Sequence, residues 1–214
     1  MLLVGIAPLV MNAVYQLLTP DSVLQGAINF RFLTGLTHQI AALVLLICLL
    51  KRQQRTLQSI GFGFQWRDLL RGFGLFVASW IVWISVSMAV NSIYSFWTGG
   101  GHSHIRDPKA IFGSPSITIF LIYVCAAPLF EETIVRGYLM TELMDLSWPP
   151  WSAALASLAL QTSYHLYYGV AGALIVGAGL SVFAIYFAFS RRVLPVIVAH
   201  LLWDLTATYA AWHR

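Results

Sequence analysis

Apolar residues form long unbroken runs along this chain, separated by short polar connections. The runs cover residues 2–18, 33–50, 69–97, 116–130, 151–168, 170–190 and 193–212, and the fourth continues as helix to about residue 145. They are too long for strands and lack the alternation of apolar and polar positions that a half-buried strand requires. About 20 apolar residues are enough for a helix to cross a bilayer. The pattern therefore predicts an all-α, polytopic membrane helical bundle with about seven transmembrane helices, within a range of roughly six to eight.

The composition agrees with this prediction and excludes several other classes of protein. Of the 214 residues, 59% are hydrophobic and 9% are charged, whereas a soluble domain is about 25% charged. A soluble globular protein, a disordered protein and a nucleic-acid-binding protein are thus excluded. By length, we predict a single integral membrane domain over residues 1–214. Cys48 and Cys125 both lie in apolar runs, and we expect them to be core residues rather than a disulfide or metal pair.

The basic residues predict the orientation of the helices in the membrane. The first run has no basic residue before it and no cleavage site after it, so we interpret it as a membrane helix rather than a signal peptide. The connection at 51–71 is rich in arginine, and Arg191 and Arg192 lie on the same side if seven helices alternate. The other side receives Arg31, Arg106, Lys109 and Arg214. Because basic residues favour the cytoplasmic side, this asymmetry predicts a cytoplasmic N-terminus.

Six ionisable residues fall inside the last four apolar runs, where charge is costly. Each charged group at membrane depth costs roughly 2.5–3.5 kcal/mol on insertion scales, and such residues are by default candidates for function. They are Glu131, Glu132, Arg136, His165, His200 and Asp204. A structural network that holds the helices together is the alternative interpretation. For His38, His102 and His104, which lie apart from this group, we expect no functional role.

The spacing of these residues predicts how they interact. Glu132 and Arg136 are four residues apart, so they share a helix face and can form an ion pair. Glu131 lies about 100° around the helix, which leaves it without a partner in its own helix and makes it a candidate general base or acid. His200 and Asp204 are also four residues apart. Together with His165 on a separate helix, these groups suit the activation of a water molecule and the stabilisation of an oxyanion.

Three short motifs resemble those of a known family. Residues 131–137, Glu-Glu-Thr-Ile-Val-Arg-Gly, are similar to an EExxxR motif, and residues 200–204, His-Leu-Leu-Trp-Asp, are similar to an HxxxN/D motif. Both are typical of the CAAX protease and bacteriocin-processing (CPBP or Abi) family of intramembrane endopeptidases. The family's FxxxH motif has its histidine at His165, but Gln161 stands in place of the phenylalanine. The resemblance covers residues 110–212, the predicted catalytic helical core, with a weaker similarity at 61–71.

The resemblance implies a role for each residue. Glu131 is expected to activate water with the help of His165, while Glu132 and Arg136 order the site. His200 and Asp204 would hold the carbonyl oxygen of the tetrahedral intermediate. The position of Gln161 is expected to pack or to line the substrate site, which leaves substrate preference open.

The resemblance also raises the question of a metal ion. Family members are often called metalloproteases, and Glu131, His165 and His200 could hold zinc. The chain has no HExxH motif, however, and a glutamate and a histidine can activate water without a metal. We therefore predict that the protein uses no cofactor, with zinc as the alternative.

The sequence thus predicts an intramembrane endopeptidase. Its partners would be the lipid bilayer and a peptide or membrane-protein substrate, either prenylated or not. A proton-coupled transporter is the first alternative, because Glu and His side chains also form proton relays. A membrane scaffold without catalytic activity is the second.

Overall fold

The computed structural model describes residues 1–19, 28–99, 111–113 and 115–212, and the predicted all-α fold is confirmed. These residues form helices and no strand. In chain order they are α1 (Leu2–Gly5), α2 (Ala7–Leu18), α4 (Ile28–Arg52), η1 (Leu57–Ile60), α5 (Arg67–Thr98), α7 (Ile117–Glu131), η2 (Glu132–Met140), α8 (Thr141–Asp145), α9 (Pro150–Tyr164), η3 (Leu166–Tyr168), α10 (Val170–Ser190) and α11 (Leu194–Trp212).

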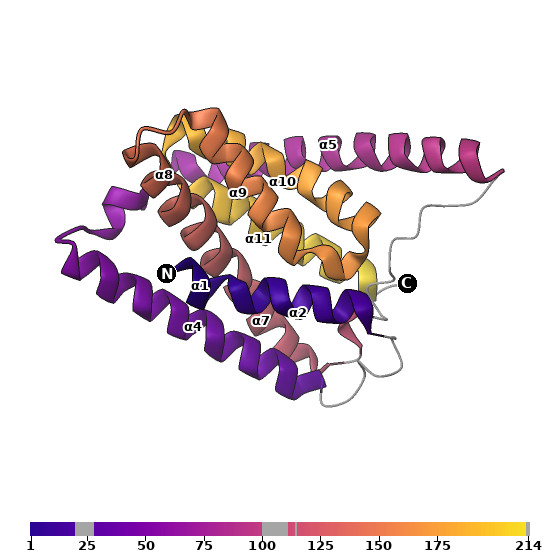
Figure 1. Cartoon of the computed structure of the whole chain (residues 1–214), viewed down its shortest axis with the longest axis horizontal. Helices are drawn as coiled ribbons and strands as arrows, with labels where there is room; N and C mark the ends of the chain where they lie inside the picture. The colour runs from indigo at the N-terminus through magenta and orange to yellow at the C-terminus, as the bar shows by residue number, and fades with distance from the viewer. Residues whose placement is uncertain (20–27, 100–110, 114, 213–214) are drawn as a thin grey trace.

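The helices pack as one bundle in which α7 connects two groups. On one side α4 lies along α7, and α1 and α2 lie beside them; on the other side α5, α10 and α11 pack together, with α9 against α10. Each group has its own cluster of buried apolar side chains. Figure 1 shows the C-terminal half of α5 extending beyond the other helices.

The outer surface of the bundle is apolar, as a bilayer requires. Among the described residues, four helices are long and apolar enough to cross a membrane: α4, α5, the continuous helix Ile117–Asp145, and α10. Large apolar side chains lie exposed along α5, at Leu70, Phe73, Ile81, Met88 and Ile93. In water an apolar surface of this extent would be unfavourable, so the chain is an integral membrane protein. The number of seven spans stays a prediction.

Two helix boundaries differ from those predicted. α4 begins at Ile28 rather than at residue 33, so Arg31 lies in the first turn of a helix and not in a connection. α9 ends at Tyr164 rather than at residue 168, and His165 follows its last turn. Nδ1 of His165 lies 2.8 Å from the backbone oxygen of Gln161. The imidazole thus satisfies a carbonyl that the helix end leaves without an intrahelical partner.

The connections predicted to share one side of the membrane meet in the structure. The N–H of Val193 donates to the oxygen of Gly61 at 3.0 Å, and Arg192 forms an ion pair with the buried carboxylate of Asp68 at 2.5 Å. This hydrogen-bonded pair raises the pKa of Arg192 above its usual range. Arg55 forms a further ion pair with Glu142 at the same end. The cytoplasmic location of this end stays a prediction.

The first helix differs from the single run that was predicted. It is interrupted at Ile6, and Gly5 lies against Ala42 near the middle of α4. Nε2 of His38 lies 2.9 Å from the backbone oxygen of Val4, which joins α4 to α1.

The expected burial of the cysteines was wrong, since Cys48 and Cys125 are exposed, free thiols. In a membrane helix an apolar position can face lipid as well as the core. Four predicted features lie outside the described residues: the His102 and His104 pair, Arg106, Lys109 and Arg214.

Candidate active site

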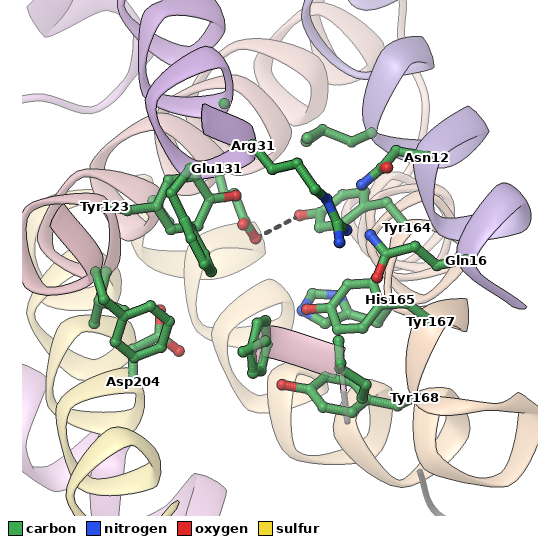
Figure 2. Close-up of a pocket in the computed structure, with 18 of the residues that line it drawn as sticks. Asn12, Gln16, Arg31, Tyr123, Glu131, Tyr164, His165, Tyr167, Tyr168 and Asp204 are labelled. Carbon is green, nitrogen blue, oxygen red and sulfur yellow. Dashed lines mark hydrogen bonds between the residues drawn. The ribbon is translucent and has the colours of Figure 1, made fainter. Parts of the chain in front are cut away.

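A cavity of about 500 Å³ lies between α2, α4, α7, η3, α10 and α11. Its walls are mostly apolar and aromatic, with Phe32, Phe112, Phe120, Tyr123, Tyr167 and Tyr168 among the lining residues. Glu131, His165, His200 and Asp204 all line it as well. Figure 2 shows Glu131, His165 and Asp204 around one open space. The predicted convergence of these side chains on one cavity is therefore observed, while their roles stay predictions.

A change of helical winding separates the two adjacent glutamates. Glu131 is the last residue of regular α-helix, and a π-helical segment begins at Glu132 and continues to Met140. π-Helical turns are rare and are frequent at functional sites. Glu131 lines the cavity, whereas Glu132 is fully buried. The two carboxylates therefore have different surroundings.

Two side chains contact the carboxylate of Glu132, Arg136 from the same helical segment and His200 from α11. Its Oε2 lies 3.2 Å from Nε of Arg136, and both side chains are 0% exposed, as the spacing predicts. Its Oε1 lies 2.7 Å from Nδ1 of His200. The other ring nitrogen of His200, Nε2, lies 3.6 Å from Oδ1 of Asp204. The shorter of the two contacts to the His200 imidazole is therefore the one from Glu132.

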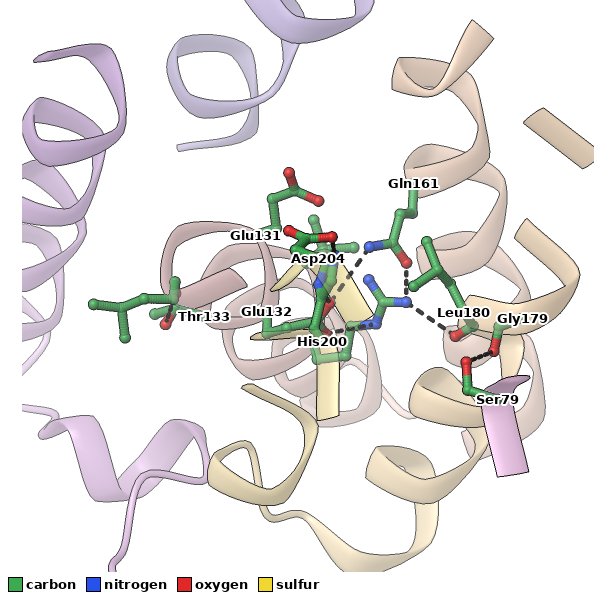
Figure 3. Close-up of polar contacts among 12 residues, drawn as sticks. Ser79, Glu131, Glu132, Thr133, Gln161, Gly179, Leu180, His200 and Asp204 are labelled. Carbon is green, nitrogen blue, oxygen red and sulfur yellow. Dashed lines mark hydrogen bonds and ion pairs between the residues drawn. The ribbon is translucent and has the colours of Figure 1, made fainter. Parts of the chain in front are cut away.

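Gln161 belongs to the same network, and of the two expected roles of its position, packing or lining the substrate site, the structure shows a packed side chain. It is fully buried and is not among the described residues that line the cavity. Its Oε1 accepts a hydrogen bond from Arg136, and its Nε2 donates to Oε1 of Glu132 at 3.4 Å. Arg136 also donates to the backbone oxygen of Leu180 at 3.3 Å. Figure 3 shows these contacts. An amide inside an apolar run, four residues before His165, is the sequence signal that could have indicated this role.

Tyr164 is a site residue that sequence reasoning missed. Its hydroxyl donates a 2.9 Å hydrogen bond to Oε2 of Glu131 (Figure 2). The ring of His165 lies next to those of Tyr164, Tyr167 and Tyr168, with centroid distances of 4.9, 5.7 and 6.3 Å. These aromatic rings fix the position of the imidazole at the end of α9.

The arrangement also gives a test of the zinc alternative. In the part of the chain that the structure describes, no group of three or more His, Cys, Asp or Glu side chains is placed to hold a metal ion. Glu131, His165 and His200 line the same cavity but are not such a group. Whether the protein uses a metal ion stays a prediction.

Apolar membrane helices and a cavity lined by ionisable side chains define an integral membrane protein with a buried polar site. Residues 113–206 match the sequence model of a family described as type II CAAX prenyl endopeptidase Rce1-like. This region contains the EExxxR and HxxxD motifs and His165, and it is similar to the CAAX prenyl endopeptidase family. No curated protein and no solved structure matches the chain.

Proposed function

We propose that this protein hydrolyses a peptide bond inside the membrane, with Glu131 as the base that activates water and without a metal ion. The observation that carries this proposal is the contrast between the two adjacent glutamates. Glu132 is sealed by Arg136, His200 and Gln161, so it has no access to substrate. Glu131 lines the cavity and, among the described residues, accepts one hydrogen bond, from Tyr164.

The hydrogen bonds of His165 suit it to help in this step. The backbone oxygen of Gln161 is only an acceptor, so Nδ1 of His165 carries the proton of their 2.8 Å contact. In the neutral ring Nε2 is then an acceptor. We propose that a water molecule donates one hydrogen to Nε2 and loses its other proton to the Glu131 carboxylate as its oxygen attacks the scissile carbonyl.

His200 is suited to stabilise the carbonyl oxygen as it becomes negative. Glu132 Oε1 is a carboxylate oxygen, so Nδ1 of His200 carries the proton of their contact. Donation from Nε2 then requires the imidazolium form, whose charge the carboxylates of Glu132 and Asp204 can balance. When the C–N bond breaks, the proton held by Glu131 passes to the leaving amine, and the two products are a carboxylic acid and an amine.

The match of residues 113–206 to this family model supports a substrate of the CAAX type. The matched family model is described as a prenyl endopeptidase, and in a CAAX sequence the prenylated cysteine is followed by two aliphatic residues and the terminal residue of the chain. We propose a membrane protein or peptide of this kind as the substrate. The aromatic walls of the cavity suit the two aliphatic residues of the motif.

The experiment is a cleavage assay with the purified full chain in lipid vesicles. A prenylated peptide with a CAAX ending is incubated with the protein, and mass spectrometry detects the products. We expect cleavage after the cysteine by the parent and none by Glu131→Gln, which nearly preserves volume. Asp145→Asn, an exposed carboxylate at the end of α8, is the matched control and should cleave like the parent. Normal cleavage by Glu131→Gln would disprove the mechanism.

A further inference from the structure

We propose that Arg31 binds the C-terminal carboxylate of the substrate, so that the cavity selects peptides by their free chain end. This inference rests on the proposed function, because it adds a binding subsite to the same cavity. Among the described residues that line the cavity, Arg31 is the only arginine or lysine. Planar guanidinium groups bind carboxylates through two parallel hydrogen bonds.

The neighbours of Arg31 suit an anionic group. Asn12 and Gln16 on α2 line the same part of the cavity, and Figure 2 shows their polar ends next to the guanidinium of Arg31. Carboxamide N–H groups are additional donors for a carboxylate.

Basic and acidic side chains lie on different walls of the cavity, with Arg31 on α4. The acidic side chains among the described lining residues, Glu131 and Asp204, come from α7 and α11, on walls other than those of α2 and α4. A peptide with a terminal carboxylate would place that end toward Arg31 and its scissile carbonyl toward Glu131 and His200. Repulsion by the acidic groups disfavours the reverse direction.

The spacing along the helices agrees with the length of the CAAX tail. Phe32, next to Arg31, packs against Phe120 and Tyr123, so the start of α4 is level with this part of α7. Glu131 follows Tyr123 by about 12 Å along the helix, at about 1.5 Å per residue. The three residues between the scissile bond and the chain end span about 10 Å when extended.

The walls between these two points suit aliphatic side chains. Phe32, Phe120 and Tyr123 form edge-to-face aromatic contacts along this path, and Val124 and Ala127 complete it. This apolar surface would receive the two aliphatic residues, while Arg31 receives the carboxylate.

The test measures binding, so that it does not depend on turnover. Fluorescent prenylated CAAX peptides with either a free terminal carboxylate or a terminal amide are titrated against the Glu131→Gln chain in lipid vesicles. We expect the free acid to bind about ten- to a hundred-fold more tightly than the amide, as expected for hydrogen bonds between charged groups. Adding Arg31→Gln should remove this preference, whereas adding Arg31→Lys should retain part of it.

Arg52→Gln is the matched control, because Arg52 is an exposed arginine in the last turn of the same helix. It should leave the preference for the free acid unchanged. Equal binding of acid and amide would overturn the inference, and so would an equal loss of affinity for both peptides in Arg31→Gln. The proposed function fails separately, if the parent chain binds the free acid selectively but does not cleave it.

Discussion

Nδ1 of His200 lies 2.7 Å from Oε1 of Glu132, so a residue of α11 and the first residue of the π-helical segment are joined inside the bundle. Glu132 also pairs with Arg136. The second glutamate of the motif thus orients the imidazole and balances its charge, while Nε2 of His200 lies on the side of Asp204. Glu132 thus belongs to a buried network with Arg136, His200 and Gln161, whereas Glu131 faces the cavity.

Arg136→Ala should destabilise the fold. It would leave Glu132 buried without its ion-pair partner, and breaking a buried pair in this way costs about 3–5 kcal/mol. The measurement is thermal unfolding in detergent. The double variant Glu132→Gln/Arg136→Met should be less destabilised, because no buried charge is left alone in that network. If Arg136→Ala is inactive but as stable as the parent, its role is catalytic rather than structural.

Gln161→Leu should weaken the same network at similar side-chain volume. Arg136 would lose one acceptor and Glu132 one donor, and leaving such buried groups unsatisfied costs about 1–3 kcal/mol. We expect a lower melting temperature and slower cleavage. The control Gln58→Leu, at an exposed position of η1, should leave both unchanged. If the Gln161→Leu chain has the same melting temperature as the parent, the amide does not contribute to the stability of the fold.

Tyr164→Phe removes the hydroxyl that fixes Glu131 and leaves the ring in place. One hydrogen bond is worth about 0.5–1.5 kcal/mol, so we expect turnover to fall by up to about ten-fold, with KM nearly unchanged. Steady-state kinetics on a CAAX peptide measures the two parameters. Tyr186→Phe, on α10 away from the cavity lining, is the control. Unchanged turnover in Tyr164→Phe would exclude a role for this contact in catalysis.

Gly61→Ala should destabilise the end of the bundle where the basic connections meet. Gly61 has φ of +95°, and a Cβ there would lie 2.6 Å from the backbone oxygen of Arg191. A left-handed conformation alone costs a residue with a side chain about 1–3 kcal/mol. Gly63→Ala is the matched control, since a Cβ there meets nothing within 4 Å. Thermal unfolding should separate the two variants, and equal melting temperatures would contradict the expectation.

Removal of divalent metal should leave cleavage unchanged. Strong chelators are added to the purified chain, and activity and bound metal are measured together. A zinc enzyme would lose activity, recover it with added zinc and contain about one ion per chain. That result would overturn the metal-independent mechanism and leave the endopeptidase assignment in place. The binding test of Arg31 would be unaffected by it.

Several features of this protein follow from the sequence because they depend on neighbours along the chain. Long apolar runs give membrane helices, since the bilayer leaves the backbone few other ways to satisfy its hydrogen bonds. The ion pair of Glu132 and Arg136 follows from a spacing of one helical turn. The convergence of Glu131, His165 and His200 could be expected because charged groups in hydrocarbon turn inward.

Tertiary structure decided which of these groups are sealed and which face the cavity. The contacts of Glu132 with His200, of Gln161 with Arg136 and of Tyr164 with Glu131 join residues that are 25 to 68 positions apart. Local periodicity contains no information on such pairs, because they depend on how whole helices are rotated and shifted against one another. The same holds for Arg31, which the sequence placed in a connection and the packing of α4 on α7 brought to the cavity wall.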